Sequence, residues 1–197
     1  MSAPSTLNTL KIMKTAPKIT TTSAAISAHL RRLALTGFMG AGKSTIGRIL
    51  AGRLQWDFLD LDAHLEARTG ATIPELFARH GEAHFRRLES AALASALGRS
   101  STILALGGGT PEELTNRLLL EQTPGTFTIF LDAPFPTLFD RCMLQDIARP
   151  VLEDPAAAQI RFAHRHPLYR RLAALTIDTA DLTPDQTVEA ILATTFG

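Results

Sequence analysis

The chain of 197 residues has very little cysteine and no long apolar run. Its single cysteine, Cys142, excludes a disulfide within the chain and fits a reducing compartment, where we expect a small buried apolar side chain. No stretch approaches 18 uninterrupted apolar residues, so the sequence predicts no transmembrane helix and no membrane partner. A compact apolar signal segment is also missing, and these absences together favour a cytoplasmic protein.

Lysine is absent after Lys43, and every later fixed cation is an arginine. Residues 31–197 carry 17 basic residues against 19 acidic ones, so their net charge is about −2. This balance is a poor electrostatic match for a polyanion, and we expect no nucleic-acid partner. An isolated lysine in a domain that otherwise uses arginine needs a local chemical reason.

Residues 1–30 lack acidic residues and are rich in serine, threonine and alanine. Their weak periodicity predicts a disordered N-terminal extension, or a start site placed too early with Met13 as the alternative. A basic, acid-free leader is also typical of an organelle transit peptide, although the first arginine is Arg31. Both interpretations remain open, and the second would place the protein in an organelle.

From Arg31 onward, short apolar runs alternate with segments of helical periodicity. We expect strands at 33–36, 58–62, 102–106, 126–132 and 175–178. We expect helices over 44–54, 73–79, 82–97, 112–121, 136–144, 155–166 and 184–194, with a break at Gly81. Five strands separated by helices predict a three-layer α/β/α fold with a five-stranded parallel sheet, in one domain spanning 31–197. Ligands of such sheets bind beyond the carboxyl ends of the strands.

The segment Gly37–Ser44, GFMGAGKS, lies between the first expected strand and the first expected helix, and it fits the P-loop pattern G-x-x-x-x-G-K-[ST]. In a P-loop, backbone N–H groups surround phosphates, the lysine reaches the β- and γ-phosphates, and the hydroxyl ligates Mg²⁺. The need for a compact point charge explains the isolated lysine. The pattern predicts a nucleotide-phosphate site made by Gly40, Ala41, Gly42, Lys43, Ser44 and Thr45, which alone does not separate a kinase that uses ATP from a GTPase or a motor.

A GTPase is disfavoured, because the motif that reads guanine includes a lysine and none follows Lys43. Two carboxylates, Asp60 and Asp62, end the second expected strand. Alternate residues of a strand point to the same side, so we expect one carboxylate near Mg²⁺ and the other beside an accepting hydroxyl. Two solvated strand-end acids are the simpler alternative, but the apolar pair before them, Phe58-Leu59, favours a buried strand that leads into a site.

Three consecutive glycines, Gly107–Gly109, follow the third expected strand. Each glycine loses more backbone entropy on folding than any other residue, so three in a row are costly. Without Cβ atoms they would let the backbone approach a ligand closely, and we expect the change Gly108→Ala to weaken binding of the phosphoryl acceptor more than binding of ATP.

Six segments together resemble the shikimate kinase family, in that family's order and near its spacing. They are GFMGAGKSTIGRILA (37–51), FLDLDAHLEARTGATIPELF (58–77), GEAHFRRLE (81–89), LGGGT (106–110), ARPVL (148–152) and RHPLYRRLA (165–173). The resemblance spans about residues 31–195 and implies a P-loop fold like that of nucleoside monophosphate kinases, a mobile lid at about 142–158 and a monomer. It also implies transfer of the γ-phosphoryl group of ATP to the 3-hydroxyl of shikimate, with one Mg²⁺ per site, in chorismate and aromatic amino acid biosynthesis. A gluconate kinase-like enzyme and a non-catalytic nucleotide-binding regulator are the alternatives.

The resemblance further implies roles on the acceptor side. Asp62 would bind the ring hydroxyls of shikimate beside the attacking 3-hydroxyl, as a base or only as an orienting group. Arg86, oriented by Glu89, and Arg165 would hold the carboxylate of shikimate. The glycines Gly107, Gly108 and Gly109 would lie against the same substrate.

On the nucleotide side, Asp60 and Ser44 would hold Mg²⁺ and Arg149 would be the lid arginine that closes on the phosphates. Arg141 would lie near the adenine or the phosphates. Two positions depart from the family: Leu182 stands where some members place an arginine near the adenine, and the glycines are followed by TPEELTN in place of small apolar residues. We expect the second departure to alter only the shape of the loop.

Overall fold

The computed structural model describes residues 29–144 and 154–196. The expected extension at 1–30 and lid at 142–158 therefore fall mainly outside the described residues, and Arg149 falls outside them entirely. Within the described ranges, no helix has the length and apolar character needed to cross a membrane.

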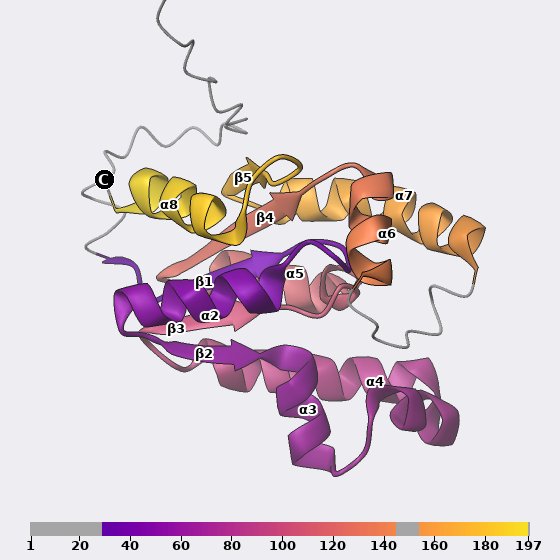
Figure 1. Ribbon diagram of the computed structural model, residues 1–197. Helices are drawn as coiled ribbons and strands as arrows, with labels where there is room; N and C mark the ends of the chain where they lie inside the picture. The colour runs from indigo at the N-terminus through magenta and orange to yellow at the C-terminus, as the bar shows by residue number, and fades with distance from the viewer. Residues whose placement is uncertain (1–28, 145–153, 197) are drawn as a thin grey trace, which may run out of the picture.

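The sheet contains five parallel strands in the order β2-β3-β1-β4-β5 (Figure 1). Their bounds are β1 Arg32–Thr36, β2 Asp57–Asp60, β3 Thr102–Ala105, β4 Thr126–Asp132 and β5 Leu175–Asp178. From the central β1, the chain builds one side of the sheet with β2 and β3, and then crosses over to build the other side with β4 and β5. This change of direction makes the carboxyl end of β1 the expected ligand-binding point. The predicted five-stranded parallel sheet is confirmed.

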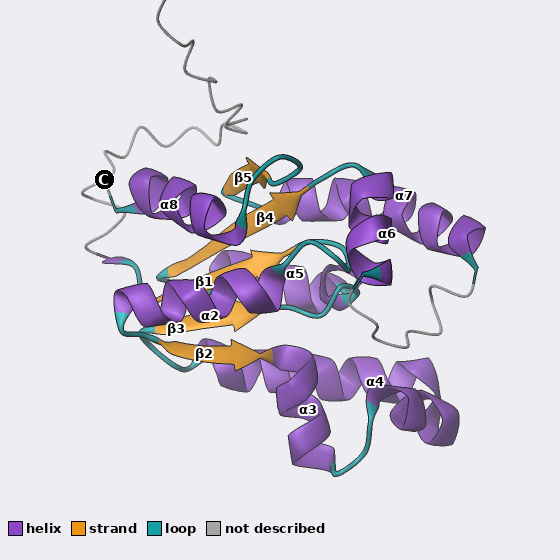
Figure 2. Ribbon diagram, in the orientation of Figure 1, coloured by secondary structure: helices purple, strands orange, loops and turns teal. Residues whose placement is uncertain are grey.

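Helices cover both faces of the sheet, which confirms the predicted three layers (Figure 2). In Figure 1, α2 and α8 lie in front of the sheet, and α4, α5 and α7 lie behind it. The helices are α2 Lys43–Leu54, α3 Leu61–Thr69, α4 Ile73–Leu97, α5 Leu114–Gln122, α6 Phe135–Met143, α7 Pro155–Leu172 and α8 Pro184–Thr195, with a short 3₁₀ helix, η1, at Thr110–Glu112.

Alternate residues of β1 supply two separate apolar clusters. Leu33 and Leu35 pack in the cluster that contains Leu50 of α2, whereas Ala34 belongs to the cluster that contains Leu93 of α4. Each fully buried leucine contributes roughly 1.5–3 kcal/mol relative to an exposed one. Burial on both faces explains why β1 reads as a continuous apolar run and not as an alternating pattern.

The second strand ends two residues earlier than predicted, at Asp60, and the unpredicted helix α3 begins at Leu61. The expectation that Asp60 and Asp62 alternate along one strand is therefore wrong. Asp60 is the N-cap of α3, and its carboxylate accepts a hydrogen bond from the Ala63 N–H at 3.3 Å. Burial of Leu61 and Leu65, one helical turn apart, fixes the helix against the core.

Helix α7 is longer than predicted, because it continues through Pro167 to Leu172. An internal proline costs a helix about 3 kcal/mol through the lost hydrogen bond and a steric clash. Burial of Tyr169 and Leu172 beyond the proline offsets that cost. The predicted break at Gly81 is present, with φ 75° and ψ 170°, although α4 runs on both sides of it.

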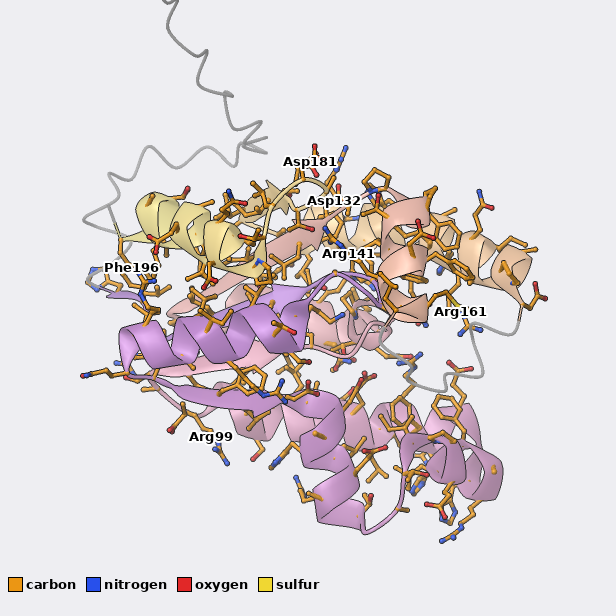
Figure 3. The ribbon with its side chains drawn as sticks, in the orientation of Figure 1. Arg99, Asp132, Arg141, Arg161, Asp181 and Phe196 are labelled. Carbon is orange, nitrogen blue, oxygen red and sulfur yellow. The ribbon has the colours of Figure 1, made fainter. Side chains whose placement is uncertain are left out.

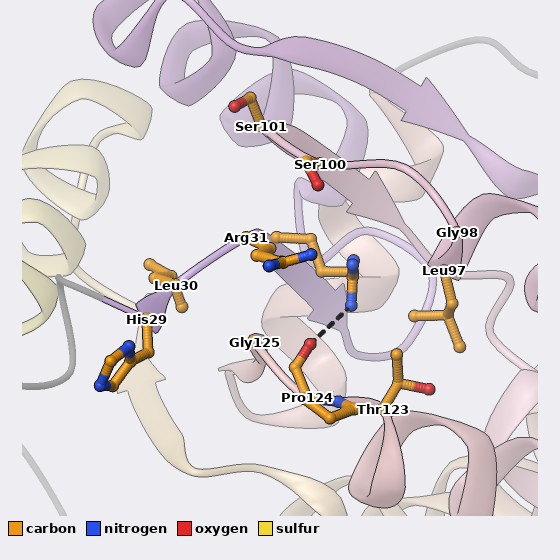
Figure 4. A pocket seen from close by; sticks show the side chains of 11 residues that line it. His29, Leu30, Arg31, Leu97, Gly98, Ser100, Ser101, Thr123, Pro124 and Gly125 are labelled. Atoms are coloured by element: carbon orange, nitrogen blue, oxygen red, sulfur yellow. Dashed lines mark hydrogen bonds between the residues drawn. The ribbon is translucent and has the colours of Figure 1, made fainter.

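An open pocket of about 870 Å³ lies at the amino edge of the sheet, where segments 29–32, 97–101 and 123–125 precede three strands (Figure 4). The buried guanidinium of Arg32 donates hydrogen bonds there to the carbonyl oxygens of Arg99 and Pro124 and to Thr126 Oγ1. These bonds tie the loops before β3 and β4 to β1, at the edge opposite to the P-loop.

Candidate active site

The P-loop turns from the end of β1 into the first turn of α2. Gly40 has φ 77°, and a Cβ atom there would collide with the carbonyl oxygen of Leu138 in α6, so only glycine fits this turn. Gly42, with φ 83°, is the N-cap of α2. The loop therefore packs against α6 while the N-terminus of α2, with its partial positive charge, faces the carboxyl edge of the sheet.

The charged and hydroxyl groups of the P-loop already have partners. Lys43 Nζ donates to the carbonyl oxygens of Gly37 at 2.8 Å and Phe38 at 3.1 Å, so the ammonium lies across the loop. Ser44 Oγ donates to Asp60 Oδ2 at 2.5 Å. The structure thus brings together the two residues that the sequence predicts for a magnesium site.

Asp62 reaches the site from the first turn of α3. A Cβ atom on Gly107 would lie 2.5 Å from Asp62 Oδ1, so the carboxylate rests directly against the glycine backbone. Burial raises the pKa of Asp62 to about 6, with a further increase from the charge of Asp60, while Lys43 acts in the opposite direction. The site therefore holds a carboxyl group that gains and loses its proton close to neutral pH.

Arg86 and Glu89 lie on the same side of α4. Arg86 Nη1 donates to Glu89 Oε2 at 2.9 Å, and Glu89 Oε1 accepts from Thr110 Oγ1 at 2.7 Å. Asn116 Nδ2 in turn donates to the carbonyl oxygen of Thr110 at 3.0 Å. Burial would lower the pKa of the Arg86 guanidinium, but its hydrogen bond to Glu89 and the nearby acidic charges raise it above its ordinary value. Arg86 is thus a fixed cation with a buried anionic support.

Arg165 approaches the same place from α7. Its Nη2 lies 2.8 Å from Glu112 Oε2, and Arg86 Nη2 lies 3.0 Å from that same oxygen. Arg165 Nε is buried and has no hydrogen-bond partner among the residues that the structure describes. Two arginines from separate helices therefore converge on one point, as a carboxylate-binding pair requires.

A sequence model described as shikimate kinase matches residues 39–195. The chain belongs to the shikimate kinase family. The resemblance drawn from the six segments is thus confirmed, while the roles of single residues stay predictions.

Known members of the family agree with the fold and the length of the chain. A shikimate kinase of Lactococcus lactis subsp. lactis (strain IL1403) is 42% identical over 159 residues, which is 80% of this chain and 93% of that protein. A shikimate kinase from Acinetobacter baumannii in complex with shikimate has a TM-score of 0.74 at 35% identity, covering 87% of this chain and 98% of that one. The structure of a Bacteroides thetaiotaomicron shikimate kinase gives a TM-score of 0.76 at 31% identity, over 83% of this chain and 97% of that chain.

In this shikimate kinase family member, the three glycines form one wall between Asp62 and the arginine pair. A Cβ atom on Gly109 would lie 2.6 Å from Arg86 Nη1, whereas one on Gly108 would lie 3.6 Å from Arg165 Nη1. Side chains therefore approach the backbone most closely at Gly107 and Gly109. We now expect a change to alanine to disturb the site at these two positions more than at Gly108.

Arg141 is bound by the loop that joins β5 to α8, beneath which it lies in Figure 3. It donates to Thr179 Oγ1 at 3.2 Å and to the carbonyl oxygens of Thr179 at 2.6 Å and Ala180 at 3.1 Å. The same loop contains Leu182, whose side chain packs against the core. Arg141 of α6 is thus held against the loop that contains Leu182.

Four residues of the site were not predicted from the sequence: Thr110, Glu112, Asn116 and Tyr169. Tyr169 is fully buried, and its hydroxyl donates to the carbonyl oxygen of Gly108 at 2.6 Å. Tyr169 lies within the RHPLY motif, so a signal for it was present. The TPEELTN segment was the only sign of the other three, and its side chains contact Glu89, Arg86 and Arg165.

Proposed function

We propose that the protein transfers the γ-phosphoryl group of ATP to the 3-hydroxyl of shikimate, which gives shikimate 3-phosphate and ADP on the way to chorismate and the aromatic amino acids. The proposal rests on one observation: a P-loop lysine, a buried carboxyl group and two converging arginines meet at one edge of the sheet. Family membership and the shikimate named in the Acinetobacter baumannii complex identify the acceptor.

The acceptor side has two binding points, one for the carboxylate of a cyclic hydroxy acid and one for its ring hydroxyls. Arg86 and Arg165 form a clamp for its carboxylate, and paired arginine contacts fix orientation as well as affinity. Asp62 lies at the other end of the glycine wall, where a ring hydroxyl would be placed. Binding at both ends holds the hydroxyl in a geometry suitable for attack, which is a large part of what a phosphoryl-transfer enzyme contributes.

The nucleotide side is formed by the P-loop amides and Lys43, with Arg149 and Arg141 as proposed phosphate or adenine contacts. The Ser44 hydroxyl and the Asp60 carboxylate are hard oxygen donors held together by their hydrogen bond. This donor set suits Mg²⁺, which takes few protein ligands and keeps waters and phosphate oxygens: Ser44 would bind the ion and Asp60 would help to hold it through water. When bound, Mg²⁺ neutralises charge on the β- and γ-phosphates.

Asp62 accounts for the proton of the acceptor hydroxyl. As the hydroxyl oxygen bonds to the γ-phosphorus, the bond from that phosphorus to the β–γ bridging oxygen breaks and ADP leaves, while the hydroxyl proton passes to Asp62. With a pKa of about 6, Asp62 is mainly ionised at neutral pH and is a stronger base than an ordinary carboxylate.

A coupled ADP-release assay with shikimate, quinate and gluconate tests the proposal. We expect ADP release that depends on shikimate, and we expect Lys43→Ala and Asp62→Asn each to lower kcat by at least about 10²-fold, as loss of one transition-state donor does. A preference for gluconate would indicate a different small-molecule kinase. No release with any acceptor would indicate a nucleotide-binding regulator.

A further inference from the structure

The arginine pair is occupied by a carboxylate of the chain itself. Glu112, the last residue of η1, places Oε2 3.0 Å from Arg86 Nη2 and 2.8 Å from Arg165 Nη2. Its other oxygen, Oε1, lies 3.6 Å from His164 Nδ1. An internal anion thus bridges the two guanidinium groups that we assign to the carboxylate of the substrate.

The ion pairs of Glu112 with Arg86 and Arg165 are partly buried, and all three side chains are charged. The side chains of Arg86 and Arg165 are only 11% and 13% exposed, and that of Glu112 is 23% exposed. Burial would raise the pKa of Glu112, but the hydrogen bond from Arg165 and the charges of Arg165, Arg86 and His164 lower it below its ordinary value. Glu112 therefore binds the arginines as an anion at neutral pH.

The second carboxylate near Arg86 differs from Glu112 in its surroundings. Glu89 is 1% exposed and also accepts a hydrogen bond from Thr110, so it is locked within the core. The Glu112 carboxylate is more exposed, and it contacts the two arginines and His164. Glu89 is therefore the permanent partner of Arg86. Glu82, whose side chain is 66% exposed, also places Oε1 3.2 Å from Arg86 Nη2, but among the described residues Glu112 alone bridges both arginines and is the carboxylate that a bridging ligand would exchange with.

A ligand carboxylate that bridges Arg86 Nη2 and Arg165 Nη2 would take the position that Glu112 Oε2 occupies. An incoming carboxylate that used the same nitrogen atoms would meet the negative charge of Glu112 at contact distance. The side that faces Gly109 is closed, since a Cβ atom on Gly109 would already lie 2.9 Å from Glu112 Oε2. A ligand carboxylate that binds both arginines through these nitrogen atoms must therefore replace Glu112.

We propose that Glu112 is an internal competitor for the substrate carboxylate, and that its displacement sets both the affinity and the selectivity for the acceptor. The inference rests on the proposed function, because it takes Arg86 and Arg165 as the clamp for the acceptor's carboxylate. A carboxylate ligand re-forms the ion pairs that it breaks, whereas a neutral polyol leaves them unsatisfied or fails to enter. Glu112 thus weakens the binding of the true acceptor and excludes uncharged analogues more strongly.

The test compares wild type with Glu112→Gln and Glu112→Ala. Glutamine keeps the shape of the side chain, and alanine removes it entirely. Glu113→Gln is the matched control, since it removes an equal charge one residue away and Glu113 forms no ion pair with the other residues that the structure describes. The dissociation constant of shikimate is measured by calorimetry without nucleotide, steady-state kinetics give kcat and both KM values, and the methyl ester of shikimate is the uncharged probe.

We expect both Glu112 variants to bind shikimate at least about tenfold more tightly than wild type, which corresponds to about 1.4 kcal/mol. The KM for shikimate should fall in parallel, while kcat and the KM for ATP change little. The methyl ester should also gain affinity, because it no longer has to break the ion pairs of Glu112, and Glu113→Gln should behave as wild type.

Several results would overturn the inference and leave the proposed function intact. Unchanged or weaker shikimate binding in both Glu112 variants would make Glu112 a bystander or a support for the arginines. No gain for the methyl ester, or an equal gain in Glu113→Gln, would show that Glu112 does not act by occupying the arginine pair. If wild type and every variant fail to bind shikimate although circular dichroism shows them folded, the proposed function itself is wrong.

Discussion

The side chains of the acceptor site fit together because one position lacks a Cβ atom. Gly109 is in contact range of both Arg86 Nη1 and Glu112 Oε2, at 2.6 and 2.9 Å from a Cβ placed there. We expect Gly109→Ala to displace Arg86 and to raise the KM for shikimate at least about tenfold, with little change in the KM for ATP. Steady-state kinetics with each substrate varied in turn measure this difference.

Gly108→Ala is the matched control for that change. A Cβ atom on Gly108 would lie 3.6 Å from Arg165 Nη1 and 3.8 Å from the Tyr169 hydroxyl, which are ordinary contact distances. This variant should therefore remain close to wild type in both KM values. If the two alanine variants raise the KM for shikimate equally, the crowding at Gly109 is not what shapes the site.

Among the elements, those with strong local signals were predicted from the sequence. Strands β4 and β5 match the predicted bounds residue for residue, because turn residues flank short apolar runs. The start of α3 was missed, since the apolar and acidic residues 58–62 fit a strand as well as a capped helix. The end of α7 was missed because Pro167 is normally a stop signal and burial further along the helix overrides it.

Residues of the candidate site could be predicted from the sequence only where they belong to a recognisable motif. The P-loop, Asp60, Asp62, Arg86 and Arg165 were found from motifs, although the strand geometry used to join the two aspartates was wrong. The bridge from Glu112 to Arg86 and Arg165 depends on three elements that are far apart in the sequence. No local periodicity encodes such a contact, and only the folded chain reveals it.

The hydrogen bond from Tyr169 connects α7 to the loop after β3. We expect Tyr169→Phe to lower the free energy of unfolding by about 1–3 kcal/mol, because the Gly108 carbonyl loses its 2.6 Å partner. The loosened glycine wall should also raise the KM for shikimate more than the KM for ATP. Urea unfolding and steady-state kinetics measure the two effects.

Thr123→Val serves as the control for this tie. It removes a side-chain hydrogen bond to the Leu119 carbonyl at the amino edge of the sheet, remote from the site. Stability should fall in this variant while both KM values stay unchanged. If Tyr169→Phe also lowers stability without changing either KM, the hydrogen bond from Tyr169 to Gly108 stabilises the fold and does not shape the site.

At the scale of the whole molecule, the parallel sheet collects at one edge the groups that are costly to bury. Asp60, Asp62, Arg86, Arg165 and Lys43 arise from four separate helices or their caps, and two apolar clusters on either side of the sheet keep those helices in place. The opposite edge uses its buried cation differently, because Arg32 has three hydrogen-bond acceptors and ties loops together. Stability is thus supplied by the core and the amino edge, while the carboxyl edge contains unfavourable charges.

This division predicts that the fold becomes more stable when Asp62 loses its charge. The pKa of Asp62 is about 6 in the folded protein, against an ordinary value of 3.8, so the folded state binds the proton more tightly than the unfolded chain does. Wild type therefore loses stability as pH rises from about 4 to about 6, by up to about 3 kcal/mol for a shift of two pKa units. Asp62→Asn does not titrate and avoids that loss.

We therefore expect Asp62→Asn to be more stable than wild type at pH 7.5 and nearly equal to it at pH 4, while its kcat is severely reduced. Chemical denaturation at the two pH values measures the difference, and Asp57→Asn, which alters an exposed carboxyl group at the start of β2, should show no such gain. The measured quantity is the stability of Asp62→Asn minus that of wild type. If this difference is no larger at pH 7.5 than at pH 4, the charge of Asp62 is not buried at a cost to the fold. The expected result would mean that the molecule gives up stability at the site where the acceptor hydroxyl loses its proton.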